Sequence, residues 1–209
     1  MTEELNLLTS DMSRLSPLEA AERLERVDVS MVVNVLGEIN PLVAQQILHE
    51  MEPAQRESVM AAAPAEKAAQ WTRNEQFPED SVGWLMEAPA AVFRPTMTVR
   101  DTIEELRKIT KRAFITYGYV TDASNKLLGI LVMRDLMLSE PTRLLSDVMY
   151  TNMFTLRPEM ELTEAMKETV NRHYPVYPVC DAEGSLLGLV RGQNLFEARA
   201  IEISAQAGS

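Results

Sequence analysis

One short sequence pattern occurs twice in this chain, and it limits the fold more than any other feature. The stretch NKLLGILVMRDL at 125–136 returns as GSLLGLVRGQNL at 184–195. Each copy reads as a turn, an apolar strand containing Leu-Leu-Gly, and the start of a helix. A pattern repeated at this spacing indicates one supersecondary unit that is built twice. Neither unit alone has enough residues for a stable core, so we expect the two to pack as a pair.

The segments before these stretches also align. MEAPAAVFRPTMTVRDTIEEL at 86–106 matches MYTNMFTLRPEMELTEAMKET at 149–169, and Arg-Pro falls at the same place in both. Each copy predicts a short strand (92–93 and 155–156), followed by an amphipathic helix (98–110 and 161–173). A hairpin of two apolar strands then turns at DASNK or DAEGS, and a short helix closes the unit. The predicted unit is therefore βαββα.

A second, shorter repeat fills residues 15–71. Its segments recur every 11 or 12 residues and start at Pro17, Val29, Pro41, Pro53 and Pro64. Proline suits the first turn of a helix, where its missing N–H needs no partner, and Ser16 and Asn40 are good N-caps. Helices this short are unstable alone and must stack. The predicted fold class is therefore α+β, with an N-terminal α-helical superhelix followed by the pair of βαββα units.

Composition excludes several functions. The 209 residues carry a net charge of −11, which opposes binding to nucleic acids or anionic membranes. The acidity is compatible with cation binding, and equally with a role in solubility alone. The longest apolar run, at 127–133, has the length of a strand, so no membrane span is expected. The single cysteine, Cys180, fits a reducing compartment and is expected to be half-buried at a strand end. No catalytic motif is present, so we do not expect an enzyme.

The repeated unit resembles the CBS domain pair in its element order, its closing LLGILVMRDL and LLGLVRGQNL stretches, and its period of about 60 residues. The stretch FPEDSVGWLMEAP at 77–89 narrows the resemblance. A helical superhelix, an EDSxGxLM junction and a CBS pair, in this order, are similar to the cytosolic region of MgtE magnesium transporters. The predicted domains are the helical domain at 1–78, the first CBS domain at 79–142 and the second at 143–200. Residues 201–209 would be a tail toward a connecting helix.

This resemblance implies a regulatory domain that senses Mg²⁺ and gates a magnesium transporter, with Co²⁺ or Mn²⁺ as competing ions. In the family, Mg²⁺ bound between the helical domain and the CBS pair holds them together and closes a transmembrane pore. The resemblance also implies a homodimer through the CBS domains and a position on the cytoplasmic side of the cell membrane. A transmembrane transporter domain, which this chain does not contain, would be the partner, and no nucleic acid is expected.

Candidate metal ligands follow from the same resemblance. Mg²⁺ prefers oxygen ligands and keeps several waters. The closing helix of the second copy carries Gln193 and Asn194 where the family often has two aspartates, which puts one site in doubt. For every candidate, a carboxylate that caps its own turn or helix is the alternative. The candidates are two residues at the junction, two in the second hairpin turn and one in the closing helix: Glu79, Asp80, Asp181, Glu183 and Glu197.

An adenine-nucleotide sensor for another partner is the alternative function. CBS pairs that bind AMP or ATP usually follow the Leu-Gly strand with Ser/Thr-x-x-Asp. The first copy has Val132 and Asp135 at these positions, and the second has Arg191 and Asn194. Only Asp135 has the carboxylate that takes ribose hydroxyls, while Arg191 would pair with a phosphate. Asp135 also suits the start of a helix without any ligand. A purely structural dimerisation module is the third alternative.

Overall fold

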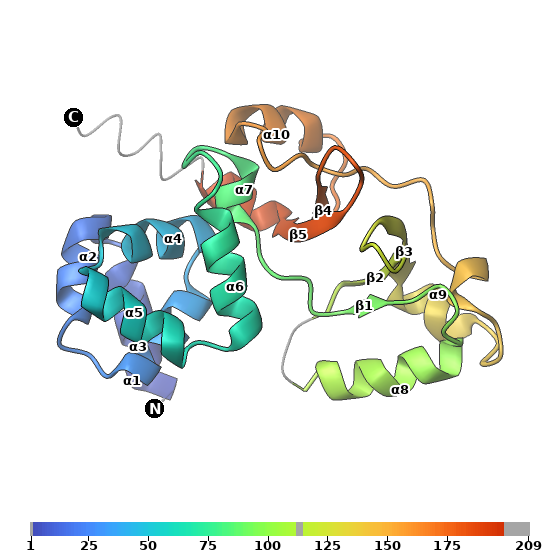
Figure 1. The fold of residues 1–209 in the computed structure, drawn as a ribbon, viewed down its shortest axis with the longest axis horizontal. Coiled ribbons are helices and arrows are strands. Elements are labelled where there is room, and N and C mark those ends of the chain that lie inside the picture. Colours follow the sequence, from blue (N-terminus) through green and yellow to red (C-terminus); the bar gives the residue numbers. More distant parts are fainter. Residues whose placement is uncertain (1, 112–114, 199–209) are drawn as a thin grey trace.

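The structure is a computed structural model that describes residues 2–111 and 115–198. A helical domain lies on one side and two smaller α+β units lie beside it (Figure 1). The second unit, at the end of the chain, sits between the helical domain and the first unit. The predicted α+β class is confirmed. Over the described ranges, no helix is both long and apolar enough to cross a membrane.

The helical domain follows the proline repeat closely. Four of the five predicted starts are the first residue of a helix, and Pro64 is the N-cap of the last one. The acidic N-terminal stretch also forms a helix, α1, which the repeat did not predict. The six helices are α1 (Thr2–Met12), α2 (Pro17–Leu24), α3 (Val29–Glu38), α4 (Pro41–Glu50), α5 (Pro53–Ala62) and α6 (Ala65–Asn74).

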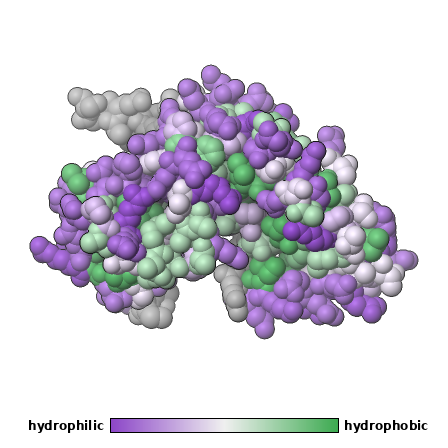
Figure 2. Space-filling view, viewed as in Figure 1, coloured by the Kyte–Doolittle hydropathy of each residue, from purple (hydrophilic) through white to green (hydrophobic). Residues whose placement is uncertain are grey.

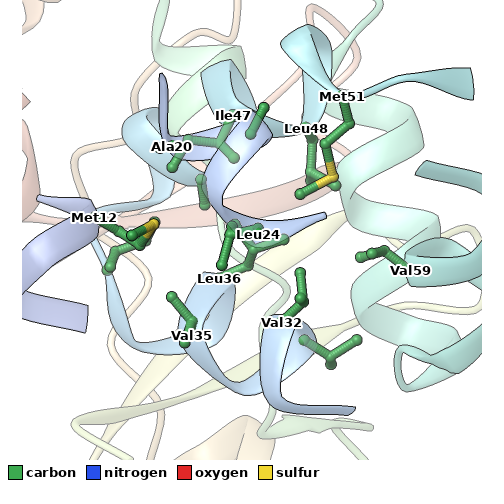
Figure 3. Close-up of a cluster of buried hydrophobic side chains, with 14 of the residues drawn as sticks. Met12, Ala20, Leu24, Val32, Val35, Leu36, Ile47, Leu48, Met51 and Val59 are labelled. Atoms are coloured by element: carbon green, nitrogen blue, oxygen red, sulfur yellow. The ribbon is translucent and has the colours of Figure 1, made fainter. Parts of the chain in front are cut away.

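Both predicted caps and the shared core of this domain are present. The Ser16 side chain caps α2 in a capping box with Glu19, and Asn40 Oδ1 accepts the Leu42 N–H at 3.0 Å. One apolar cluster joins side chains from all six helices, so each short helix is stabilised by its neighbours (Figure 3). Its labelled members are Met12, Ala20, Leu24, Val32, Val35, Leu36, Ile47, Leu48, Met51 and Val59.

The first unit has the predicted βαββα order. Strand β1 pairs in parallel with β2, and β2 pairs antiparallel with β3. Helix α8 buries Val99, Thr102 and Leu106, and its outer side chains form a hydrophilic surface (Figure 2). The elements are β1 (Val92–Phe93), α8 (Val99–Ile109), β2 (Tyr117–Thr121), β3 (Leu127–Val132), α9 (Met133–Leu138) and the 3-10 turn η1 (Leu145–Asp147).

The second unit repeats this order, and it differs from the prediction in two places. Its elements are α10 (Leu162–Thr169), β4 (Val176–Cys180), β5 (Leu186–Arg191) and a helix at 192–198. The predicted strand at 155–156 is reduced to one parallel bridge between Leu156 and Val179. Helix α10 ends at 169 rather than 173, because residues 170–172 form a turn and His173 after it adopts a φ of 54°, outside the helical region.

Cys180 is buried, with 3% of its surface exposed, so the expectation of a half-buried side chain was wrong. All five residues of β4 are buried, because this strand has packed side chains on both faces. The position of Cys180 at the end of a strand therefore did not determine how exposed its side chain is.

The two hairpin turns lie side by side and join the units. The Leu127 N–H donates to Gly184 O at 2.9 Å, and the Leu186 N–H donates to Asn125 O at 3.0 Å. Asn125 (φ 65°) and Gly184 (φ 87°) occupy equivalent turn positions in the left-handed region, which asparagine and glycine tolerate best.

The segment between the helical domain and the first unit packs on the second unit. It contains α7 (Val82–Leu85), whose side chains are buried in the same cluster as Tyr177 and Val190. Two backbone bonds fix it there, from Val82 N to Met160 O (2.9 Å) and from Gly83 N to Pro158 O (2.8 Å). The helical domain is therefore held beside the second unit, although the first unit follows it in the chain.

Candidate functional site

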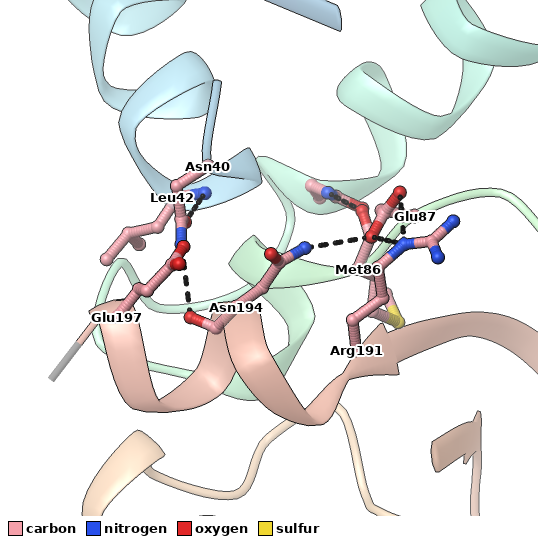
Figure 4. A network of polar contacts seen from close by, with 8 residues as sticks. Asn40, Leu42, Met86, Glu87, Arg191, Asn194 and Glu197 are labelled. Atoms are coloured by element: carbon pink, nitrogen blue, oxygen red, sulfur yellow. Dashed lines mark hydrogen bonds and ion pairs between the residues drawn. The ribbon is translucent and has the colours of Figure 1, made fainter. Parts of the chain in front are cut away.

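A cleft of about 1040 Å³ lies between the helical domain and the second unit. Its first wall comes from the end of α3, the start of α4 and one side of α6. Its second wall comes from residues 86–88, the end of β5 and the closing helix at 192–198. Polar and charged side chains from both walls meet across it (Figure 4).

Glu87 is the centre of this polar network. Its carboxylate accepts a hydrogen bond from Asn194 Nδ2 at 3.0 Å and forms an ion pair with Arg191 Nε at 3.1 Å. Two backbone bonds to Leu189, of 2.8 and 2.9 Å, fix the position of Glu87 on β5. The carboxylate is therefore held by the closing helix and by the strand that precedes it (Figure 4).

Asn40 connects the helical domain directly to the closing helix. While its Oδ1 caps α4, its Nδ2 donates to Asn194 O at 3.1 Å and to Glu197 Oε2 at 3.3 Å. The other carboxylate oxygen of Glu197 accepts from Gln193 Nε2 at 2.8 Å. The predicted N-cap is therefore also a bridge between two parts of the molecule, which the sequence pattern did not indicate.

Three further contacts close the same interface. Buried Asn74 of α6 donates to Met86 O at 2.8 Å, and Arg73 donates to Leu187 O at 2.7 Å. Leu42 of α4 is 1% exposed and belongs to the apolar cluster of the second unit rather than to that of its own domain. The interface therefore combines an apolar anchor with a polar network.

The Glu87–Asn194 contact has an equivalent in the first unit, with donor and acceptor exchanged. Tyr150 occupies the repeat position of Glu87, and Asp135 occupies that of Asn194. The Tyr150 hydroxyl donates to the Asp135 carboxylate, and Tyr150 pairs with Ile130 as Glu87 pairs with Leu189. Each unit thus has one carboxylate at this place, from the helix in the first unit and from the incoming segment in the second.

The candidate nucleotide-binding residues are engaged within the protein. Hydrogen bonds from Tyr150 and then Arg134 hold the pKa of Asp135 below its usual value. Arg191 and Asn194 both donate to Glu87. The space between the two sheets, lined in part by Tyr117 and Arg191, measures about 140 Å³. Small-molecule pockets usually begin near ~300 Å³, so this space is smaller than a usual ligand pocket, and neither Asp135 nor Asn194 lines it.

The junction candidates lie on the surface. Glu79 and Asp80 are both exposed, and the backbone of Asp80 accepts the Leu162 N–H at 2.9 Å. A bridge between Ser81 and Glu161 brings the exposed Glu161 to the same surface. Glu161 was missed by the sequence reasoning, because only the pairing of the junction with the second unit places it there.

The hairpin candidates have the bonding of an ordinary turn. Asp181 Oδ1 accepts from the backbone N–H groups of Glu183 (3.1 Å) and Ser185 (2.8 Å), and the Glu183 side chain is exposed. Arg157 donates to the Asp181 backbone carbonyl, and Lys126 lies against the same turn at Gly184. Two basic side chains thus lie against this turn.

The five metal candidates therefore lie at three separate places: the junction, the hairpin turn and the closing helix. Over residues 2–111 and 115–198, no three His, Cys, Asp or Glu side chains come together as a metal site. Mg²⁺ is commonly held by one or two carboxylates and several waters, so the donor set at the junction fits this ion. The nominated ligands stay predictions.

Comparison with known proteins agrees with the architecture. The CBS domain family model matches residues 81–140 and 145–201. Magnesium transporter MgtE of Thermus thermophilus is 27% identical over 78% of this chain and 34% of its own length. MgtE of Bacillus subtilis is 28% identical over 65% of this chain and 30% of its own length. The chain therefore spans about a third of the length of these relatives.

A solved structure covers more of the chain. The cytosolic domain of the Mg²⁺ channel MgtE in complex with ATP is 26% identical, with a TM-score of 0.77. The similarity covers 91% of this chain and 78% of that one, so it includes the helical domain as well as the repeated units. The resemblance to the MgtE cytosolic region is thereby confirmed, and the chain belongs to the CBS domain family.

Proposed function

We propose that this chain is a Mg²⁺-responsive regulatory module of a magnesium transporter, acting on the cytoplasmic side of the membrane. The observation that carries the proposal is the docking of the helical domain on the second CBS domain, where Asn40 donates to Asn194 O and to the carboxylate of Glu197, in a cleft that Glu87 also lines. Carboxylate-rich contacts respond to cations, because a bound cation removes the repulsion between acidic walls.

The mechanism is a shift between two populations. Docked and separated arrangements of the helical domain differ in how close their carboxylates lie, so Mg²⁺ favours the docked one by its differential affinity. The exposed carboxylates of Glu79, Asp80 and Glu161 would hold the ion at the junction. Glu197 would do so at the cleft, and Asp181 and Glu183 are candidates at the hairpin turn. Co²⁺ or Mn²⁺ would compete for the same oxygen ligands.

The partners follow from the same proposal. A transmembrane transporter domain would receive the signal, and the chain itself would have a regulatory rather than a catalytic role. A homodimer would form through the CBS domains. Helix α9 supports this, because it exposes 72% of Met137 and 79% of Leu138, and Leu144 nearby is 40% exposed. Exposed large apolar side chains are the kind that an interaction surface covers.

A melting series tests the proposal. The chain is heated in 0–20 mM MgCl₂ at constant ionic strength, with NaCl as the matched control. A site with a Kd of ~1 mM in ~10 mM Mg²⁺ stabilises the folded state by about 1.4 kcal/mol. For a chain of this size the melting temperature should rise by about 3–6 °C per site. The rise should shrink in Asp80→Asn if the junction holds the ion, and a flat series would refute the proposal.

Binding of an adenine nucleotide is the second candidate function. It is favoured by Asp135, which carries a carboxylate at the ribose position, and by the solved MgtE relative, which is a complex with ATP. AMP or ATP is added to the same melting experiment in EDTA. A saturable rise with nucleotide beside a flat Mg²⁺ series would select this function over the first.

A further inference from the structure

The cleft between the helical domain and the second CBS domain is acidic, and it contains a basic side chain, Lys67, that forms no ion pair with any described residue. Among the described residues that line it, four are glutamates and two are basic: Glu38, Glu66, Glu87, Glu197, Lys67 and Arg191. Arg191 is paired with Glu87 at 3.1 Å. Over residues 2–111 and 115–198, no carboxylate oxygen lies within 4.0 Å of Lys67 Nζ.

Lys67 is nevertheless held in place by the surfaces around it. Its ammonium group lies against Gly37, where a methyl group would come within 2.6 Å of Nζ. Gly37 belongs to the last turn of α3, whose carbonyl groups form the negative end of the helix dipole. Lys67 Nζ also lies 5.7 Å from the ring centre of Trp71, one turn later in α6. The missing side chain of Gly37 thus makes room for an ammonium group between two helices.

The charges around Lys67 come from both walls of the cleft. Burial lowers the pKa of Lys67, while the carboxylates of Glu87 and Glu38 act in the opposite direction. Glu38 belongs to the helical domain, and Glu87 is fixed on the second CBS domain by Leu189. Lys67, Glu38 and Glu87 line the same cleft, so separation of the walls takes the ammonium of Lys67 away from the Glu87 carboxylate but not from Glu38.

We propose that Lys67 is a tethered cation of the cleft, which holds the helical domain against the second CBS domain when no divalent cation is bound. A side chain attached to α6 thereby supplies positive charge to acidic walls that would otherwise repel each other. Lys67 sets the population of docked molecules in the absence of Mg²⁺. This role of Lys67 is therefore separate from the response to added Mg²⁺ proposed above.

The test measures the docked population in a chelator. Fluorescent labels are placed on exposed positions of the two parts, by Glu22→Cys in α2 and Glu164→Cys in α10, with Cys180→Ala to remove the buried native thiol. Energy transfer between the labels is recorded for single molecules in EDTA at low salt. The variant is Lys67→Met, and the control is Lys167→Met, which removes the same charge from an exposed position outside the cleft.

Lys67→Met should raise the ratio of separated to docked molecules about threefold, the size expected for a part-exposed ion contact. Lys167→Met should leave the ratio unchanged. In 0.5 M NaCl the difference between the unsubstituted chain and Lys67→Met should fall, because salt screens the contact. Equal ratios for Lys67→Met and Lys167→Met in EDTA would overturn the inference. A missing Mg²⁺ response would instead count against the proposed function alone.

A second variant tests the inference if Lys67→Met destabilises the helical domain. Gly37→Ala keeps the net charge and replaces glycine with a better helix former, so α3 should not be weakened. The new methyl group displaces the ammonium from its place against α3. The separated population should then rise in EDTA without a fall in melting temperature. An unchanged population in this variant would overturn the inference as well.

Discussion

The Asn194 amide donates a 3.0 Å hydrogen bond to the carboxylate of Glu87, and this bond joins the closing helix of the second CBS domain to the segment that enters the first. The amide stands where the first CBS domain carries Asp135 at the equivalent position of the repeat. An amide can donate to a carboxylate without added charge, whereas an aspartate would require a cation between the two groups. The amide at position 194 therefore lets this contact form without a cation.

Replacing this amide by a carboxylate should make the interface depend on a cation. Asn194→Asp removes the hydrogen bond and sets two negative charges against each other, so the free energy of unfolding in EDTA should fall by about 1–2 kcal/mol. Urea denaturation with and without 10 mM MgCl₂ measures the loss and its recovery. Asn194→Ala is the control, because it loses the bond and adds no charge. Equal behaviour of the two variants at every Mg²⁺ concentration would contradict this expectation.

Asn40 should contribute to two different properties through its two side-chain ends. Asn40→Ala removes a helix cap, which costs about 1 kcal/mol, and also removes the bonds to Asn194 and Glu197. Ser16→Ala removes a cap of similar strength on α2, on a helix that does not line the cleft. Both variants should lower the melting temperature, but only Asn40→Ala should increase the separated population in the fluorescence measurement. A similar increase in Ser16→Ala would show that the loss of any helix cap separates the domains, and it would contradict the role assigned to the Asn40 bonds across the cleft.

Leu42 should be the apolar anchor of the helical domain. It is 1% exposed within the cluster of the second CBS domain, so Leu42→Ala should lower the free energy of unfolding by about 2–5 kcal/mol. Leu18→Ala is the matched control, since Leu18 of α2 is 52% exposed and should lose less than about 0.5 kcal/mol. Limited proteolysis should then cut the junction at 75–81 faster in Leu42→Ala alone. An undisturbed junction would contradict the assigned role.

Cys180 should be chemically inert in the folded protein. Burial, followed by the nearby charge of Asp181, raises the pKa of its thiol to about 11. Because the thiolate is the reactive form, a disulfide reagent at pH 8 should modify Cys180 slowly until the chain is unfolded in guanidinium. Since the folded pKa is raised, stability contributed by the neutral thiol should be lost above the unfolded pKa, between about pH 9 and 11. Fast modification of the folded chain at pH 8 would contradict the buried position.

Tyr150 should control the acidity of Asp135. The Tyr150 hydroxyl is the first cause of the lowered Asp135 pKa, so Tyr150→Phe should move that pKa upward, toward its usual value. A lowered folded pKa contributes stability above the unfolded pKa, and this contribution is lost as the pH falls through the folded value. The variant should therefore lose less stability than the unsubstituted chain on acidification below about pH 4. NMR titration of the side-chain carboxyl group measures the shift, with Tyr174→Phe as control.

The local sequence determined most of the helices, strands and turns. Pro17, Pro41 and Pro53 start helices because proline suits the first turn, and Asn125 and Gly184 form equivalent turns because they tolerate a positive φ. The repeated Arg-Pro and Leu-Leu-Gly stretches predicted two copies of one unit. Helix α1 was missed because it lies before the proline repeat that starts at Pro17, and the end of α10 was missed because residues 170–172 form a turn without any glycine or proline.

The candidate site was decided by tertiary structure. Glu87, Lys67 and Asn40 were not predicted as site residues, because each is an ordinary surface residue type in its own segment. Packing of α7 on the second CBS domain brings Glu87 to Asn194, which lies 107 positions away in the chain. The space at Gly37 admits the ammonium of Lys67 from another helix. Helix caps and turns depend on neighbours within about four residues, so the sequence itself determines them. A charged interface depends on which distant surfaces meet, and only the folded chain decides that.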